Sequence, residues 1–431
     1  MFGLFKKKAF KPTVTAEDKE WVEQNIRWFI EVFGPAKLKE RPFILPTPDT
    51  FPYNDLKDPH QFNKLFEQLC ACWEVDPGEI DVKFFDDIKS KQWTNLAPEG
   101  PTAEPLGQYY RPYSREEKRF RINVAKSNLD HSQLLVAVIA HELAHVKLLG
   151  GNYIQHTDPA MEPLTDLASI FFGFGLFAAN TCQIQEAYWI GRSGYLSNEL
   201  ISYSNATICY ISGQDIQTYL PFLNTNTKAL FKQDHEYLAS TGDTILTRDE
   251  VSRCEAVFET NRQLAEGFEK RMFDQVIEAC ERLLRVNPKN TDAYNCLGYA
   301  LLSQKKYEEA IEVFTKAITI DPYGDYPYNN RGYCKLQLGM QDDAFADIHS
   351  ALEMNPDNSF AWRNMGAYYL AVSDYEQALL HFEEAEKADP KTEMINFYLG
   401  QVHLKLGNGD KANFYLDRSR EMNEYNYSKT G

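Results

Sequence analysis

The sequence has no Cys-x-x-Cys pair, no secretory leader pattern and no excess of basic residues. Its eight cysteines are scattered over 431 residues without the spacing of a small disulfide-stabilised domain, so we expect reduced thiols. The formal net charge of −17 excludes a general nucleic-acid binder, because such a protein needs a basic surface to displace phosphate counterions. The opening MFGLFKKKAFKPT has a basic cluster but no following apolar segment, so no export signal is expected.

A long apolar run of the kind that spans a membrane is also missing. The longest uncharged stretch, Leu167 to Gln185, becomes polar from Asn180 onward, which leaves its apolar part too short to cross a bilayer. This stretch predicts a buried helix. With neither an export signal nor a membrane span expected, the sequence predicts a cytoplasmic protein.

The composition is typical of a folded protein with more than one core. Hydrophobic residues make up 43% of the chain, aromatic residues 13% and charged residues 25%, which favours a globular over a disordered chain. A length of 431 residues exceeds what one ordinary core organises and predicts two or three domains.

The C-terminal half carries an internal repeat with a period of 34 residues. A proline, a glycine and an alanine mark each unit at fixed positions. They are Pro288, Pro322, Pro356 and Pro390; Gly298, Gly332, Gly366 and Gly400; and Ala310, Ala344, Ala378 and Ala412. Small residues let two helices cross closely, and proline ends the second helix. Each unit resembles a tetratricopeptide repeat, which implies an all-α superhelix of about four to five helix pairs.

The two ends of this array depart from the pattern, as terminal units of repeat proteins do. The unit from Val257 to Asn290 has Leu264 at the glycine position and Val276 at the alanine position. The last unit has Glu424 where the proline is expected. We interpret both as capping units of the array.

The polar stretch at 240–250 is the candidate linker between two parts of the chain. The sequence thus predicts a first domain over residues 1–250, with a helical region at its N-terminal end. It predicts a tetratricopeptide repeat domain over residues 251–431.

In the first domain, the segment VIAHELAHVKLLGG (138–151) follows an alternating strand pattern and lies in a predicted buried helix. On a helix His141 and His145 lie one turn apart on one face, where both rings can reach a single metal ion. Glu142 is turned about 100° away and can approach a water molecule instead. Burial of these three groups without partners costs on the order of several kcal/mol, so the motif predicts a zinc site.

Two histidines do not complete a catalytic zinc site, which has three protein ligands. The elongated motif of the metzincins requires histidine at position 151, which is Gly151, so that class is excluded. His156 and Asp158 are available in a predicted loop. Glu162 is the better candidate, because it opens an apolar helix that would pack against the motif helix.

Asp166 follows Glu162 by one turn, so both carboxylates lie on one helical face. There Glu162 would bind the metal, and Asp166 would accept a hydrogen bond from a ligand histidine. This arrangement resembles the gluzincins, zinc peptidases with a glutamate as third ligand. The resemblance implies an α+β zincin-like domain of minimal gluzincin type, with zinc held by His141, His145 and Glu162 and with Asp166 as the partner of His141. The alternative is that Glu162 is only an acid favoured by the dipole at the start of the helix and that Asp166 only caps it.

The gluzincin resemblance also implies peptide hydrolysis, with Glu142 accepting a proton from the attacking water and passing it to the leaving amine. By the same analogy, the strand at 120–126 would pair along its edge with an extended peptide. No motif identifies a side chain that stabilises the transition state. Tyr195 and His235 are the downstream candidates.

The repeat domain is expected to form a concave surface that grips protein segments and is lined by the first helix of each unit. The candidate peptide-binding groove consists of Asn295, Tyr299, Tyr326, Asn329, Tyr333, Phe360 and Arg363. We therefore expect an intracellular zinc-dependent metallopeptidase with Zn²⁺ as cofactor and a protein or peptide partner. Two alternatives stay open: a non-catalytic zinc-containing scaffold or adaptor, and a peptidase specific for one partner such as a repressor.

Overall fold

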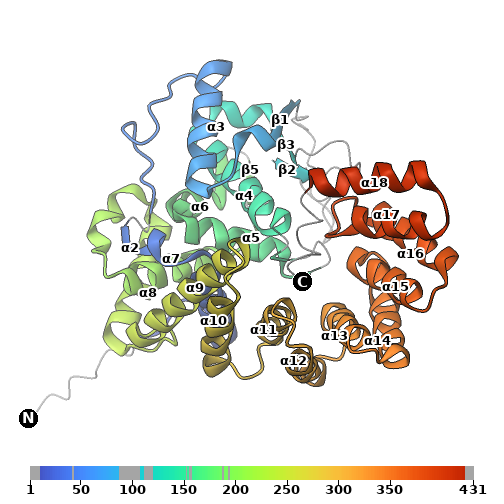
Figure 1. Ribbon diagram of the computed structural model, residues 1–431. Helices are drawn as coiled ribbons and strands as arrows, with labels where there is room; N and C mark the ends of the chain where they lie inside the picture. Colours follow the sequence, from blue (N-terminus) through green and yellow to red (C-terminus); the bar gives the residue numbers. More distant parts are fainter. Residues whose placement is uncertain are drawn as a thin grey trace, which may run out of the picture. The chain divides into compact units, whose positions relative to one another are not determined.

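The chain divides into two compact units, Met1–Phe258 and Glu259–Gly431, and helices predominate in both (Figure 1). A computed structural model describes residues 10–40, 43–86, 107–110, 120–151, 153–154, 158–186, 189–192 and 195–422.

The first unit contains α-helices, β-strands and short helical turns. The helices are α1 (Ala16–Phe33), α2 (Ala36–Glu40), α3 (Pro59–Trp73), α4 (Ser132–Gly150), α5 (Met161–Ser169), α6 (Gly175–Thr181), α7 (Asn198–Ser212) and α8 (Thr225–Thr241). The strands are β1 (Ile80–Phe85), β2 (Gly107–Tyr110), β3 (Phe120–Ala125), β4 (Gln183–Glu186) and β5 (Trp189–Arg192). Short helical turns are η1 (Pro77–Glu79), η2 (Lys126–Asp130), η3 (Ile170–Phe174), η4 (Ile216–Thr218) and η5 (Leu220–Phe222).

The two units meet inside a helix rather than in a polar linker. Residues 240–250 include the end of α8 and the start of α9 (Arg248–Glu269). Leu246 and Cys254 are buried in the core of the first unit. The first unit therefore continues beyond residue 250, the predicted end of the first domain.

The sheet of the first unit places β3 in the centre, with β1 parallel on one side and β2 antiparallel on the other. Ile122 and Val124 are buried, while Arg121 and Asn123, which alternate with them, are half-buried, as the alternating sequence predicts. The end of α4 returns to the start of this strand, where the Phe120 ring packs so closely on Gly150 that a Cβ there would lie 2.9 Å from it. The central strand thus sets the position of α4.

Helix α4 is almost wholly buried, because its sequence has an apolar residue at nearly every position. It ends at Gly150, as the two glycines predict. Asn128 and Asp130, two polar residues that precede this helix, do not cap it. The turn η2 takes up both residues, so the helix begins at Ser132 after His131, with no side-chain cap.

Two helical stretches, Ser132–Gly150 and Met161–Thr181, are long and apolar enough to cross a bilayer by length and composition alone. Within the first unit 72% and 83% of their most apolar windows are buried, as in core helices of a globular unit. The second stretch bends at Gly173, where φ is 101° and the carbonyl accepts a hydrogen bond from the Ile44 amide at 2.8 Å. These helices form the core that supports the candidate site.

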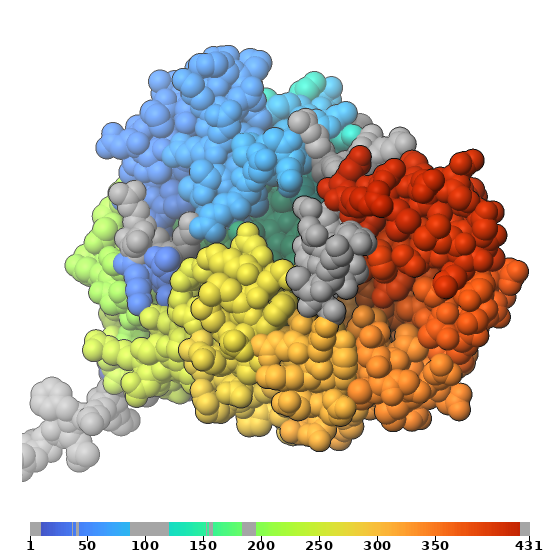
Figure 2. Space-filling model, in the orientation of Figure 1, coloured from blue at the N-terminus to red at the C-terminus, as the bar shows by residue number. Residues whose placement is uncertain are grey.

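The second unit is a succession of antiparallel helix pairs that follows the 34-residue period (Figure 1). Its helices are α10 (Phe273–Val286), α11 (Thr291–Ser303), α12 (Tyr307–Ile320), α13 (Asp325–Gln337), α14 (Gln341–Met354), α15 (Ser359–Ala371), α16 (Tyr375–Ala388), α17 (Ile395–Lys405) and α18 (Gly409–Glu421), after the C-terminal part of α9. In the space-filling view, successive repeats lie side by side from orange to red (Figure 2). Glu424, assigned to the capping unit, lies outside the described residues.

The repeated glycines mark the points where the two helices of a pair touch. A Cβ on Gly298 would lie 2.5 Å from the Phe314 ring, and a Cβ on Gly366 would lie 2.6 Å from the Phe382 ring. The repeated alanines are fully buried in the same interfaces. The repeat therefore records a steric requirement, since only the smallest side chain lets the rings approach the neighbouring backbone.

Changing Gly366 to alanine is expected to lower the free energy of unfolding by about 1–3 kcal/mol, because the new methyl group overpacks the Phe382 contact. The matched control is Gly409→Ala, since a Cβ at Gly409 meets nothing within 4 Å. That change should be neutral or stabilise by up to about 1 kcal/mol through helix propensity. Urea denaturation followed by circular dichroism measures both. Equal shifts in the two variants would contradict the steric role of the repeated glycine.

Candidate metal centre

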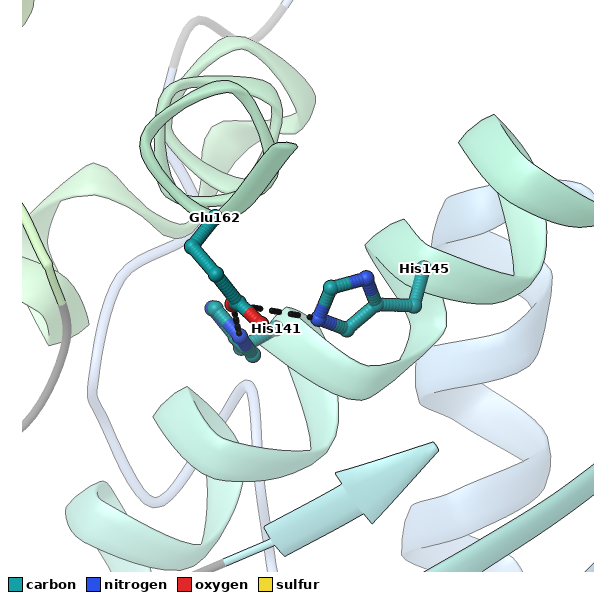
Figure 3. A group of neighbouring side chains, drawn as sticks. All are labelled: His141, His145 and Glu162. Atoms are coloured by element: carbon teal, nitrogen blue, oxygen red, sulfur yellow. Dashed lines mark hydrogen bonds and ion pairs between the residues drawn. The ribbon is translucent and has the colours of Figure 1, made fainter. Parts of the chain in front are cut away.

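Three side chains from α4 and α5 converge in the first unit (Figure 3). His141 and His145 project from the same face of α4, and Glu162 projects toward both from the first turn of α5. One Glu162 oxygen, Oε2, lies 3.2 Å from Nε2 of His141 and 3.3 Å from Nε2 of His145. One donor atom of each residue lies within 4.8 Å of the other two. This arrangement offers two imidazole nitrogens and one carboxylate oxygen to a single point.

His141 is held in place from its other ring nitrogen. Its Nδ1–H donates a hydrogen bond to Oδ1 of Asp166, with 2.8 Å between the atoms. The second oxygen of Asp166 accepts the backbone N–H groups of Tyr195 and Leu196 at 2.5 and 3.0 Å. Asp166 therefore fixes the ring orientation of His141 and ties the segment at 195–196 to the site.

His145 has a different anchor, the hydroxyl of Thr165. That hydroxyl donates to the Met161 carbonyl at 2.8 Å, so at 3.4 Å it acts as an acceptor for Nδ1–H of His145. Thr165 is fully buried and lies three residues after Glu162, on the same helical face. The sequence contains this spacing, and reading the α5 face as a whole would have found Thr165.

Glu142 is 4% exposed and lies beside the cluster rather than in it. Its Oε2 atom is buried and has no hydrogen-bond partner among the described residues. Burial raises the pKa of Glu142 to about 7, although the neighbouring His141 lowers it. A carboxyl group with a pKa near neutrality and an unsatisfied oxygen is suited to accept and release a proton.

Burial and mutual hydrogen bonds shift the pKa values of the other titratable groups of the cluster. Burial would lower the pKa of His141, but its hydrogen bonds to Asp166 and Glu162 raise it well above its usual value. Burial lowers the pKa of His145. Burial would raise the pKa of Glu162, yet its hydrogen bonds to both histidines lower it to about 2. Glu162 is thus a carboxylate at neutral pH, as a metal ligand must be.

The residues present fit a zinc ion. Nitrogen and oxygen donors of this kind are the usual ligands of catalytic zinc, which has three protein ligands and one open position. A cation would also offset the local charge, because Glu142, Glu162 and Asp166 surround only two imidazoles. The buried Glu142 oxygen, which lacks a partner among the described residues, lies on the same helix one residue from a ligand.

The remaining predicted site residues of the first unit fall into two groups. The ring of Tyr195 stacks on the His141 ring, with centroids 5.9 Å apart, so Tyr195 lies at the cluster. His235 lies in α8, and the charged groups that act on its pKa are Asp215 and Glu236, neither of which belongs to the cluster. Of the alternative ligands, His156 lies outside the described residues. Asp158 accepts the Ala160 amide and is not among the clustered ligands.

The prediction that the strand at 120–126 offers an edge to a peptide is wrong. This strand is β3, and it pairs along its full length with β1 and also with β2. Its backbone groups are therefore engaged on both sides. The short strand β2 is the edge strand on one side of the sheet. The sequence of β3 shows that it is a strand but not that it lies between β1 and β2.

The predicted groove residues all lie on the first helices of three pairs, α11, α13 and α15. Asn329 is 1% exposed, so it does not line an open surface. Its amide donates to Asn330 at 3.2 Å and accepts from Asn364 at 2.8 Å. Asn330 in turn donates to Asn295 at 3.2 Å. Asn295 and Asn329 thus belong to an amide chain that joins neighbouring repeats.

The other groove residues differ in exposure. Tyr326 is half exposed, and Tyr299 and Tyr333 are half-buried. Burial raises the pKa of both half-buried tyrosines. Arg363 lies 5.4 Å from the ring centroid of Phe360, close enough for a cation–π contact. These side chains, unlike that of Asn329, are at least partly exposed.

The second unit belongs to the class of stacked helix pairs, and its repeats are tetratricopeptide repeats. Models of the tetratricopeptide repeat family match residues 291–323 and 363–418. The repeat assignment made from the sequence is therefore confirmed. No curated protein matches the chain.

Several solved structures resemble part of the chain. A crystal structure of MamA protein is 20% identical, with a TM-score of 0.31, and the match covers 39% of this chain and 91% of MamA. The first tetratricopeptide domain of Spaghetti (RPAP3) bound to an HSP90 peptide is 25% identical, with a TM-score of 0.26. The match covers 27% of this chain and 93% of that domain's chain. The tetratricopeptide repeat domain of Arabidopsis OM64 is 20% identical, with a TM-score of 0.25. The match covers 26% of this chain and 93% of that domain's chain.

Proposed function

We propose that this chain is a zinc-dependent metallopeptidase whose tetratricopeptide repeats dock its protein substrate. The observation that carries the proposal is the combination at the candidate metal centre. His141, His145 and Glu162 present three donor atoms to one point, and Glu142 presents a buried oxygen without a hydrogen-bond partner among the described residues. A purely structural metal site has no use for Glu142.

Each residue of the centre has a role in this proposal. His141, His145 and Glu162 would hold zinc, which supplies Lewis-acid polarisation of the scissile carbonyl when bound. Glu142 would take a proton from the attacking water and deliver it to the leaving amine, which its pKa near 7 favours. Tyr195, stacked on His141, is the candidate that stabilises the developing negative charge.

The first unit would then be an α+β zincin-like domain of the minimal gluzincin type. Its sheet followed by a histidine-bearing helix and a glutamate-bearing helix supports this assignment. All eight cysteines are free thiols, which supports a reducing compartment such as the cytoplasm.

The proposal is tested by exposing the zinc-loaded full chain to peptides derived from a cell lysate and identifying new termini by mass spectrometry. Cleavage should depend on zinc and disappear after chelation. The same experiment with intact folded proteins addresses a peptidase that accepts one partner only, such as a repressor. A zinc-loaded protein that cleaves neither set would contradict the proposed activity.

The second candidate function is a non-catalytic scaffold that contains zinc. It is favoured by the family models, which match residues within the repeats alone. A scaffold should keep all partner binding when Glu142 is replaced and should leave every captured partner intact. Partner capture by the full chain, followed by gel analysis of the captured proteins for zinc-dependent fragments, separates the two functions.

Changing Asp166 to asparagine is expected to lower zinc affinity about 10- to 100-fold, because the amide orients His141 less firmly than the carboxylate does. Zinc titration against a chromophoric chelator measures the affinity. The comparison variant is Asp158→Asn, which changes an acid outside the cluster before the same helix. It should keep the wild-type affinity. A greater loss at Asp158 than at Asp166 would contradict the assignment of the partner of His141.

A further inference from the structure

Strand β1 is an edge of the three-stranded sheet in the first unit (Figure 1). Among the described residues it pairs with β3 alone, in parallel register along its whole length. The backbone N–H and C=O groups on its other side therefore have no strand to pair with in the described part of the chain. Such an edge is a template for the addition of another strand.

The apolar side chains of β1 lie on one face of the sheet, because successive residues of a strand point to opposite sides. Ile80 is buried, Val82 is half-buried and Phe84 is 37% exposed. Ile122 and Val124, which lie beside Val82 and Phe84 on β3, are fully buried. The apolar face is therefore covered in the centre of the sheet and becomes exposed along the β1 edge.

A groove of about 440 Å³ separates this edge from α3. Phe62 and Phe66 of α3 line it together with Ile80, Val82 and Phe84 of β1. The rings of Phe62 and Phe84 meet edge to face, with their centroids 4.8 Å apart. A strand paired with β1 would place every second side chain in this groove.

The opposite face of β1 carries two opposite charges, Asp81 and Lys83. Their side chains are 38% and 57% exposed, and Lys83 Nζ lies 3.7 Å from Asp81 Oδ2. Nε of Arg121 on β3 lies 3.4 Å from the same oxygen. Both distances exceed those of strong charge-assisted hydrogen bonds, so Asp81 and Lys83 can also bind charges on an added strand.

The sequence of β1 is complementary to itself in one antiparallel register. When two copies pair about Val82, Asp81 of each copy lies opposite Lys83 of the other, and opposite charges in this position stabilise a strand pair. On the groove side Ile80 then lies opposite Phe84, and Val82 lies opposite its own copy. A shift by two residues would instead place Lys83 opposite Lys83 or Asp81 opposite Asp81. Only the register about Val82 therefore satisfies both faces.

We propose that two copies of this chain associate by antiparallel pairing of their β1 strands about a two-fold axis at Val82. The charge pattern of Asp81 and Lys83 identifies the occupant of the edge as a second copy, since an unrelated segment needs no such pattern. The contact is self-complementary, as in most symmetric dimers. Pairing joins the two sheets and covers the exposed part of the groove. This inference does not depend on the proposed peptidase, because no zinc ligand lies on β1.

The experiment measures the oligomeric state of the full chain by sedimentation velocity over a range of concentrations. The variants are the charge reversals Asp81→Lys and Lys83→Asp, alone and combined. The matched control is Lys64→Asp, because Lys64 is an exposed residue of α3 that does not line the groove. Circular dichroism establishes that each variant is folded. Lys83→Asp keeps the Asp81–Arg121 contact, so it tests the proposal even if Asp81→Lys does not fold.

The wild type and Lys64→Asp are expected to form dimers of equal affinity. By symmetry each single reversal creates two like-charged pairs, so it should raise the dissociation constant of the dimer about tenfold or more. The combined variant has opposite charges across the pair again and should regain the wild-type affinity. Zinc content should be equal in all variants, so failure of the dimer would leave the proposed peptidase unaffected.

A mixture of the two folded single variants gives the sharpest result. In a mixed pair every lysine at these positions faces an aspartate, so the mixture should form a heterodimer at concentrations where each variant alone is monomeric. An affinity tag on one variant detects it. A wild type that stays monomeric at about 100 μM would overturn the proposal. So would a dimer that survives both single reversals, or a mixture of folded variants that does not associate.

Discussion

Replacing Glu142 by glutamine is expected to lower the rate of peptide hydrolysis by about 10²- to 10⁴-fold while zinc content and fold stay unchanged. The amide has nearly the shape of the carboxyl group but cannot accept a proton from water. The buried oxygen of Glu142, unpartnered among the described residues, and its pKa of about 7 are the properties that the substitution removes. No zinc ligand is altered, so the metal should stay bound.

The rates must be compared at equal zinc occupancy, by elemental analysis of the same samples used for cleavage. The matched control is Glu199→Gln, which makes the same chemical change at an exposed position in the first turn of α7. It should cleave at the wild-type rate. Undiminished cleavage by Glu142→Gln would remove Glu142 from the mechanism, and cleavage lost together with zinc would assign it a structural role.

Replacing His145 by alanine is expected to reduce bound zinc from about one ion per chain to background. Three donor atoms meet at the candidate metal centre, and removal of one leaves too few for a stable catalytic site. Because zinc binds the folded chain, added metal should also raise the melting temperature of the wild type. At a free zinc concentration 100 times the dissociation constant the gain is about 2.7 kcal/mol. The variant should show no such rise.

The control for this experiment is His131→Ala, which removes an exposed histidine at the N-terminal end of the same helix. It should retain both the zinc and the thermal shift. Elemental analysis after metal-replete purification measures the first, and calorimetry with and without zinc measures the second. Equal, negligible zinc in the wild type and in His145→Ala would contradict the zinc site and, with it, both functions proposed for the first unit.

The repeat unit and the motif helix follow from local sequence patterns alone. A period of 34 residues with glycine and alanine at fixed places predicts that the two helices of each unit pack closely at those residues. In the structure Gly298 packs against Phe314 and Gly366 packs against Phe382. The placement of His141 and His145 on one face of the helix likewise follows from their spacing and from helix geometry alone. Such features are local, because the residues that matter lie within one or two turns of each other or repeat along the chain.

The surroundings of those features were decided by the tertiary structure. Tyr195 and Leu196 donate to Asp166 across almost 30 residues of chain, and no spacing rule relates them. The strand at 120–126 has no free edge because β1 and β2, the two strands that precede it in the chain, pair on its two sides. Asn329 fits the position of a groove residue, yet its amide is buried in contacts with neighbouring repeats.

Glu393 shows the same division within one repeat. The period places it at the first position of a helix, and the local sequence contains no glycine that would favour the left-handed turn at Met394. Beside this turn, Arg271, Tyr299 and Arg363, which belong to other repeats, contact the side chain and the carbonyl of Glu393. Local sequence sets the free-energy cost of a backbone conformation, but contacts between distant segments decide whether that cost is offset in the folded protein.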